Sequence, residues 1–298
     1  MADKCLTIPT MPRRLSFLLV IVAPVAVFAA MVLADRAFCG AGRGYDYVVR
    51  LSLPPPADEI GLPKVLGPLD ASRPLVVIDA GHGGHDPGAG NGSLKEKALT
   101  LALAQALRDA LLAGGGVRVA LTRDDDRFLL LPERAGIARR LKADLFISIH
   151  ADSSGNPDAS GATVYTLSER GSSDTAARLA ESENRADVIN GVSLSGKDDA
   201  VSAILVDLSQ RESAAQSADF AGLVLREGSG HLNFREQAIQ SAAFIVLKSA
   251  DLPSVLFEAG YISNADDAAW LASSQGQQAF ADATARAVRV YFARRLAG

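Results

Sequence analysis

After residue 74, short runs of β-branched residues alternate with segments of helical periodicity, and this alternation constrains the fold more than any other feature. Strands are predicted at residues 75–79, 117–121, 145–149, 162–167, 243–247 and 255–257, and helices at residues 94–113, 132–141 and 280–296. Strands that alternate with helices form a mostly parallel, twisted sheet with helices on both faces. We therefore expect a single α/β domain over residues 75–298.

Residues 176–235 interrupt this alternation. The stretch is rich in Ala, Ser, Asp and Glu, is helical in pattern and contains no convincing central strand. Within it, Val201, Ile204, Leu205 and Leu208 follow the i, i+3, i+4, i+7 spacing of one apolar helix face. An insertion of this length is often functional or mobile, but a helical cap packed on the sheet has the same pattern. The pattern alone leaves both interpretations open.

The N-terminus has the composition of an export signal. Lys4, Arg13 and Arg14 precede an apolar run over residues 17–34. We expect residues 1–34 to be a cleaved signal peptide. The alternative is an uncleaved N-terminal anchor, because a run of this length nearly spans a bilayer of about 30 Å. Both interpretations place the rest of the chain in the periplasm, and membrane contact would be made only through residues 17–34.

Residues 35–74 are predicted to be an extended linker. Proline occurs there repeatedly, at Pro54, Pro55, Pro56, Pro63, Pro68 and Pro74. Proline lacks a backbone donor and has a fixed φ, so this stretch suits neither a helix nor a central strand. The linker is also too short for a separate wall-binding domain of ordinary size.

The composition excludes several classes of protein. A hydrophobic content of 48% supports a packed core, and a formal net charge of -4 leaves no basic stripe for a nucleic acid. Cys5 and Cys39 lie outside the expected domain, so neither a disulfide framework nor a cysteine-ligated zinc site is available. The imidazoles available to a metal are those of His82, His85, His150 and His231.

Four polar side chains lie where the expected elements meet one edge of the sheet. His82 follows the first strand, His150 and Glu258 end later strands, and Glu96 opens a helix. Ligands gather at the carboxyl ends of parallel strands, and two imidazoles with one carboxylate form a catalytic zinc set. We assign His82, Glu96 and His150 as zinc ligands and Glu258 as the general acid and base. Spacing alone leaves two alternatives open. The roles of Glu96 and Glu258 could be exchanged, or the histidines could be structural residues that bind no metal.

The motifs, in order along the chain, resemble those of the zinc-dependent N-acetylmuramoyl-L-alanine amidases, the amidase-3 family. They are VIDAGHGGHDPGA at residues 77–89, Glu96-Lys97, LTR at 121–123, LPER at 131–134, FISIHAD at 146–152 and PSVLFEAGYISN at 253–264. The resemblance implies that zinc is bound by His82, Glu96 and His150 and that Glu258 is catalytic. It also implies hydrolysis of the amide between N-acetylmuramic acid and the L-alanine of the stem peptide.

The insertion resembles the regulatory segment of Gram-negative cell-division amidases. Residues 205–210 are similar to their activator-docking helix, and residues 181–187 to the segment that blocks the cleft. The resemblance implies that a glutamate completes the zinc shell in the resting state; Glu183 is the first candidate and Glu181 the second. A LytM-type activator would then dock on the apolar stripe Val201, Ile204, Leu205 and Leu208, unless that stripe is core.

The sequence is compatible with three functions. The first is a zinc amidase for cell-wall remodelling or daughter-cell separation, autoinhibited by its insertion and acting as a monomer. The second is a zinc peptidase that cuts within peptidoglycan stem peptides. The third is a non-catalytic wall-binding regulator, which the intact set of His82, Glu96, His150 and Glu258 disfavours. In all three, the expected partner is peptidoglycan and not a nucleic acid.

Overall fold

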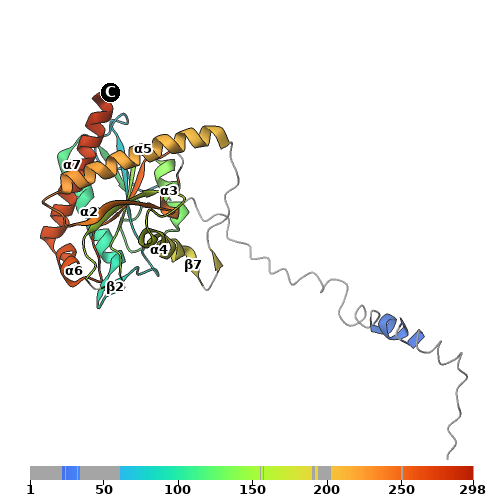
Figure 1. The fold of residues 1–298 in the computed structure, drawn as a ribbon. Helices are drawn as coiled ribbons and strands as arrows, with labels where there is room; N and C mark the ends of the chain where they lie inside the picture. The colour runs from blue at the N-terminus through green and yellow to red at the C-terminus, as the bar shows by residue number, and fades with distance from the viewer. Residues whose placement is uncertain are drawn as a thin grey trace, which may run out of the picture. The chain divides into compact units, whose positions relative to one another are not determined.

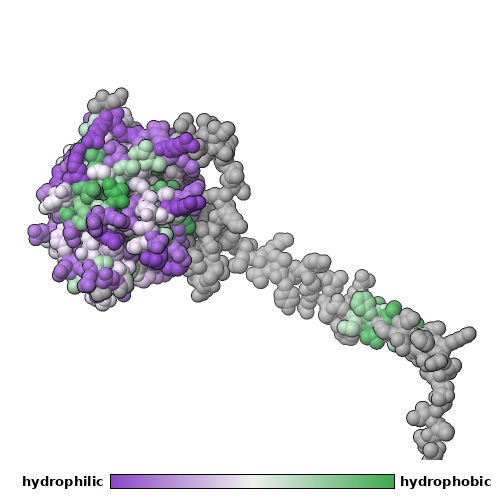
Figure 2. All heavy atoms as spheres, viewed as in Figure 1, coloured by the Kyte–Doolittle hydropathy of each residue, from purple (hydrophilic) through white to green (hydrophobic). Residues whose placement is uncertain are grey.

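The computed structural model (Figure 1) describes residues 22–23, 25–31, 33, 61–154, 156, 158–189, 192–193, 203–249 and 251–297. The chain divides into two compact units, Met1–Ile60 and Gly61–Gly298. In the first unit, the described residues are helical and expose apolar side chains such as Val25 and Phe28. Figure 2 shows this helical segment as a green, apolar stretch. Among the described residues, no helix combines the length and the apolar character that a membrane crossing requires. Cleavage of a signal peptide stays a prediction.

A six-stranded sheet with strand order β4-β1-β5-β10-β6-β9 forms the centre of the second unit (Figure 1). The strands are β1 (Leu75–Ala80), β4 (Arg118–Leu121), β5 (Leu145–His150), β6 (Ala162–Leu167), β9 (Phe234–Ala242) and β10 (Ser254–Glu258). Strands β4, β1, β5 and β10 are parallel, while β6 runs antiparallel to β10 and parallel to β9. The prediction of a mostly parallel sheet is confirmed.

Helices cover both faces of this sheet. One face packs against α2 (Glu96–Gly114), α5 (Ala203–Gly228), α6 (Ala265–Ala272) and α7 (Ser274–Ala297). The other face packs against α3 (Leu131–Arg140), α4 (Asp174–Glu183) and the short 3-10 helix η2 (Ile245–Leu247). Every residue of β1 and β5 is buried, which explains why these strands have continuous apolar sequences.

The strand predicted at residues 243–247 is wrong. The edge strand is β9, which precedes that segment, and η2 occupies most of it. Val246 and Leu247 are buried against the α3 side of the sheet, so their apolar character reflects core packing and not strand pairing. The sequence of β9, FREQAIQSA, was not recognised as a strand because it is mostly polar. Its polar character follows from its position at the sheet edge, where only some of its residues are buried.

The insertion has two structurally different parts. The first contains α4, a 3-10 turn η1 (Asn184–Asp187) and a small hairpin, β7 (Val188–Ile189) with β8 (Val192–Ser193). The second is α5, where Phe220, Leu223 and Val224 are buried in the core beside α7. The C-terminal half of α5 is therefore a cap packed on the sheet. The predicted docking stripe, Val201, Ile204, Leu205 and Leu208, lies outside the residues whose side chains are described.

The last residues of the expected linker belong to the second unit. Leu66 pairs with Val119 in an antiparallel bridge, with N···O distances of 2.8 and 2.9 Å in the two directions. This bridge extends the sheet beyond β4, the edge strand that would otherwise be open. The sequence-based boundaries at residues 34 and 74 themselves stay predictions.

Candidate metal centre and active site

The loop after β1 carries His82 in a backbone conformation that is uncommon for a residue with a side chain. Its φ is 60°, in the left-handed region. Arg134 stabilises this conformation, because its guanidinium donates to the carbonyls of Ala80 and His82 at 2.8 and 2.9 Å. Glycine is required at Gly81, since a Cβ there would lie 2.5 Å from the His150 ring. The loop thereby brings the two imidazoles to a centroid separation of 4.9 Å.

A buried ion pair lies beneath this loop. The carboxylate of Asp79 is 3.0 Å from the guanidinium of Arg134 and also accepts hydrogen bonds from Thr122 and Ser148. Burial opposes ionisation of Asp79, but Arg134 and the two hydroxyls outweigh it and hold the pKa below its usual range. The loop that carries His82 therefore rests on a fully hydrogen-bonded, charged network.

The four predicted site residues meet at the carboxyl edge of the sheet. His150 is the last residue of β5 and Glu258 the last of β10, and they are direct partners in the parallel register. Glu96 is the first residue of α2 and is 1% exposed. A helix N-terminus stabilises negative charge, which suits a buried carboxylate at this position.

The carboxylate of Glu96 lies between the two imidazoles. Its Oε2 is 3.1 Å from Nε2 of His82, and its Oε1 is 3.2 Å from Nδ1 of His150. Each oxygen also accepts a backbone hydrogen bond, from Ala89 at 2.8 Å and from Ala151 at 2.9 Å. The orientation of Glu96 is therefore set by the backbone of two loops.

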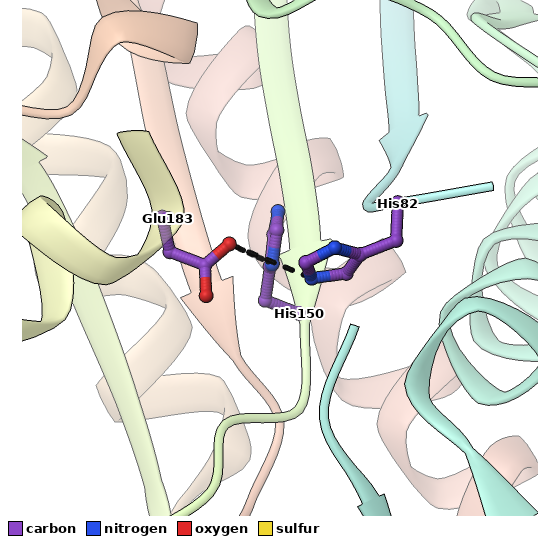
Figure 3. Close-up of side chains that lie close together, drawn as sticks. All are labelled: His82, His150 and Glu183. Atoms are coloured by element: carbon purple, nitrogen blue, oxygen red, sulfur yellow. Dashed lines mark ion pairs between the residues drawn. The ribbon is translucent and has the colours of Figure 1, made fainter. Parts of the chain in front are cut away.

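A second carboxylate reaches the same imidazoles from α4 (Figure 3). Oε2 of Glu183, the last residue of α4, is 3.1 Å from Nδ1 of His150 and 3.5 Å from Nε2 of His82. Donor atoms of these three buried residues all lie within 4.8 Å of one another. Glu181 instead is exposed and pairs with Arg185 at 3.5 Å. Of the two candidates from the insertion, only Glu183 enters the site.

Three buried atoms of this cluster fit a metal ion. Nε2 of His82, Nδ1 of His150 and Oε2 of Glu183 have no hydrogen-bond partner within the part of the chain that the structure describes. Buried polar atoms in native proteins are nearly always paired. Imidazole nitrogens and carboxylate oxygens are the donors that zinc prefers in catalytic sites. A metal cation would satisfy all three atoms at once.

The charges around the cluster also favour a cation. Burial opposes a positive charge on His82, but the carboxylates of Glu96 and Asp86 raise its pKa to about 10. Burial opposes the charge on His150 as well, yet Glu183 and Glu96 raise its pKa well above the usual value. The surroundings therefore place positive charge at both imidazoles, where a bound metal ion would replace the protons.

Asp86 orients His82 and was not identified from the sequence. Its Oδ2 lies 2.7 Å from Nδ1 of His82, so Nε2 is the nitrogen left to face Glu96 and Glu183. A carboxylate on the second ring nitrogen is the usual support of a metal-binding histidine. In the sequence, the role of Asp86 was indicated only by its position four residues after His82 in a glycine-rich loop.

Glu258 lies beside the imidazoles but makes different contacts. No ion pair among the described residues joins it to either histidine, and its Oε2 accepts a hydrogen bond from the backbone of Asp152 at 2.9 Å. Burial, reinforced by the charge of Asp152, raises the pKa of Glu258 well above its usual value. Burial and the charge of Glu183 likewise raise the pKa of Asp152 to about 7. A carboxyl group in these surroundings holds a proton readily.

The other two histidines do not enter the cluster. His85 is exposed and its ring contacts Phe128 in a tilted arrangement, with a centroid distance of 4.1 Å. His231 is exposed just after the end of α5, where its backbone donates to the carbonyl of Gly228. Of the four histidines, the structure brings together the two that the strand ends predicted.

Fold and site together define an α/β protein with a buried imidazole–carboxylate centre that is compatible with a metal ion. The family model described as N-acetylmuramoyl-L-alanine amidase, Amidase_3, matches residues 76–290. The chain therefore belongs to the N-acetylmuramoyl-L-alanine amidase family. The family resemblance inferred from the motifs is confirmed.

Individual relatives agree with this assignment. The N-acetylmuramoyl-L-alanine amidase AmiA of Salmonella typhimurium is 39% identical over 223 residues, which are 74% of this chain and 77% of that protein. AmiC of Escherichia coli is 37% identical over 242 residues, 80% of this chain and 57% of that protein. Among solved structures, the amidase AmiC2 of Nostoc punctiforme aligns with a TM-score of 0.53 at 30% identity, over 74% of this chain and 98% of that one.

Proposed function

We propose that this chain is a zinc-dependent amidase that hydrolyses the bond between N-acetylmuramic acid and L-alanine in peptidoglycan. The observation that carries the proposal is the convergence of unpartnered, buried imidazole nitrogens on one point beside two carboxylates. Family membership supports the substrate. The rest of the proposal assigns a task to each side chain.

His82, Glu96 and His150 would hold the zinc ion. Bound zinc would supply Lewis-acid activation of a water molecule and of the scissile carbonyl. Asp86 keeps Nε2 of His82 directed at the centre, and the backbone donors of Ala89 and Ala151 keep the Glu96 carboxylate in place. We assign the ligand role to Glu96 rather than to Glu258, because the oxygens of Glu96 lie 3.1 and 3.2 Å from the two imidazoles.

Glu258 would carry the proton. Its carboxylate takes a proton from the attacking water, whose oxygen bonds to the carbonyl carbon. It then gives that proton to the alanine nitrogen as the carbon–nitrogen bond breaks. Burial raises the pKa of Glu258, which suits its role as proton donor to the leaving nitrogen in the second step. The products are the free lactyl carboxylate and a stem peptide with a free L-alanine amine.

Glu183 would hold the enzyme in an inactive state. Its Oε2 faces both imidazole nitrogens from α4, where it would compete with water and substrate for a bound metal. A LytM-type activator, docked on Val201, Ile204, Leu205 and Leu208, would withdraw α4. Such control fits a periplasmic monomer that is exported by residues 1–34 and used in cell-wall remodelling or daughter-cell separation.

Product chemistry tests this function against its rivals. Purified sacculi are treated with the protein and with Glu183→Ala, each with and without a chelator, and the released material is analysed by mass spectrometry. Chelator-sensitive release of stem peptides with a free L-alanine amine is expected, and His82→Ala should release none. Cuts within the stem peptide would favour the peptidase, and no release by folded, zinc-loaded protein would favour the wall-binding regulator.

A further inference from the structure

Two buried oxygens near the site remain unpartnered and are not explained by the metal. They are Oγ1 of Thr163 and Oε1 of Glu258, and neither has a hydrogen-bond partner among the described residues. Thr163 is 1% exposed and Glu258 is 4% exposed. A buried hydroxyl or carboxyl oxygen without a partner carries a desolvation cost, so this pair requires an explanation.

The sheet register places these two residues side by side. Glu258 of β10 is the direct antiparallel partner of Thr163 of β6, and on its other side it pairs with His150 of β5. Directly opposed residues point to the same face of a sheet, with Cβ atoms about 4.5–5.5 Å apart. His150, Glu258 and Thr163 therefore form one row across three strands.

The row lies on the face of the sheet that α4 covers. Two positions before Glu258 and two after Thr163, Leu256 and Tyr165 are buried in the core cluster that contains residues of α4. Because side chains alternate along a strand, Glu258 and Thr163 point the same way as Leu256 and Tyr165. The Thr163 side chain thus points to the α4 side of the sheet and not to the side of α2, α5 and α7.

The two carboxyl oxygens of Glu258 have unequal support. Oε2 accepts the backbone hydrogen bond of Asp152 at 2.9 Å, whereas Oε1 has none. Thr163 is the cross-strand neighbour with a free donor, and its hydroxyl accepts or donates no bond to the strand backbone among the described residues. A hydroxyl hydrogen can rotate to whichever acceptor is available.

We propose that Thr163 is a positioning residue for Glu258: its hydroxyl donates a hydrogen bond to a water molecule that in turn donates to Oε1, and this bridge fixes the carboxyl group for proton transfer. The proposal rests on the proposed catalytic use of Glu258. With Oε2 held by Asp152 and Oε1 by Thr163, the carboxyl plane can no longer rotate away from the reacting water. Such a group affects the rate of the chemical step more than substrate binding.

The kinetic test uses the full chain and three substitutions. Thr163→Val removes the hydroxyl at nearly constant volume, Thr163→Ser keeps it, and Thr166→Val makes the same change on β6 on the opposite face of the sheet. For Thr163→Val we expect kcat to fall about tenfold or more, as part of the effect of general acid–base catalysis, with KM and zinc content unchanged. Thr163→Ser and Thr166→Val should stay within about twofold of the original protein.

A spectroscopic readout separates this proposal from the proposed function. The infrared carboxyl band of Glu258 is isolated by subtracting the spectrum of Glu258→Gln, which requires no turnover. A shift of that band in Thr163→Val, reversed in Thr163→Ser, is expected even if the protein proves inactive as an amidase. An unshifted band, an unchanged kcat, or a serine variant that behaves like the valine variant would overturn the proposal. If Thr163→Val does not fold, Thr163→Ala is compared with Thr163→Ser by the same two readouts.

Discussion

Oε2 of Glu183 lies 3.1 Å from Nδ1 of His150, although the two residues come from different layers of the fold. Glu183 ends α4, and His150 ends a central strand of the sheet. The contact joins the insertion to the candidate metal centre, and under the proposed function it would place a carboxylate where water and substrate bind.

Removal of this carboxylate should raise the basal activity. Glu183→Ala is expected to increase chelator-sensitive release of stem peptides about tenfold or more, which corresponds to about 1.4 kcal/mol of blocking interaction. The assay is dye release from labelled sacculi. The matched control is Glu181→Ala, which removes an exposed carboxylate from the same helix and should leave the rate unchanged. Equal rates for the two variants would exclude Glu183 as the blocking residue.

Glu258→Gln should separate metal binding from turnover. The amide cannot take up and return a proton, so kcat should fall about 10²- to 10⁴-fold. Zinc content, measured by elemental analysis, should stay at that of the original protein, because the closest contacts to the imidazoles are made by Glu96 and Glu183. Glu236→Gln, on the exposed side of β9, is the control. Loss of zinc from Glu258→Gln would mean that the two glutamate assignments must be exchanged.

Asp86→Ala should weaken zinc binding. The substitution removes the acceptor 2.7 Å from Nδ1 of His82, so the ring loses its fixed orientation and its tautomer. We expect zinc affinity to fall about 10- to 100-fold in competition with a chromogenic chelator. Asp124→Ala, an exposed residue elsewhere in the domain, should have no effect. An unchanged affinity for Asp86→Ala would argue against Nε2 of His82 as a ligand.

The ion pair of Asp79 and Arg134 should give the domain a specific sensitivity to acid. At pH 7, Asp79→Asn leaves the buried guanidinium unpaired and should lower the free energy of unfolding by about 3–5 kcal/mol. The pKa of Asp79 in the folded state lies below the ordinary value of 3.8, so its contribution to stability is complete above that value. The contribution is lost as the pH falls through the folded pKa.

Urea unfolding between pH 7 and about pH 3 measures this effect. The difference in the free energy of unfolding between the original protein and Asp79→Asn should become smaller as the solution becomes acidic. Asp158→Asn, an exposed control, should follow the original protein at every pH. A difference in the free energy of unfolding that does not depend on pH would show that the charge of Asp79 does not stabilise the fold.

The central part of the fold was predictable because its strands are short, apolar and buried on both faces. Residues 145–149 have this property throughout, and the structure places them in β5. The edge strand β9 was not predictable, since its sequence alternates irregularly between charged, amide and apolar side chains. Residues 243–247 were misassigned because burial in a 3-10 helix and burial in a strand require the same apolar side chains.

The same distinction applies to the site. His150 and Glu258 could be placed because they end recognisable strands that share one edge. Asp86, Arg134 and Thr163 could not be identified in this way, because their importance depends on their neighbours in the folded chain. Asp86 contacts a ring nitrogen of His82, Arg134 binds the carbonyl of His82 in its left-handed turn, and Thr163 lies opposite Glu258 on the neighbouring strand. Polar residues of these kinds are common, and only the folded arrangement distinguishes them.

The most direct test of the metal centre is a zinc K-edge X-ray absorption spectrum of the zinc-loaded full chain. One zinc ion is expected, with two imidazole nitrogens, further oxygen donors at about 2.0–2.2 Å and no sulfur. His150→Ala should lose one imidazole from the coordination shell. A shell that contains sulfur or fewer than two imidazoles, or a protein that binds no zinc, would contradict the assignment of His82, Glu96 and His150.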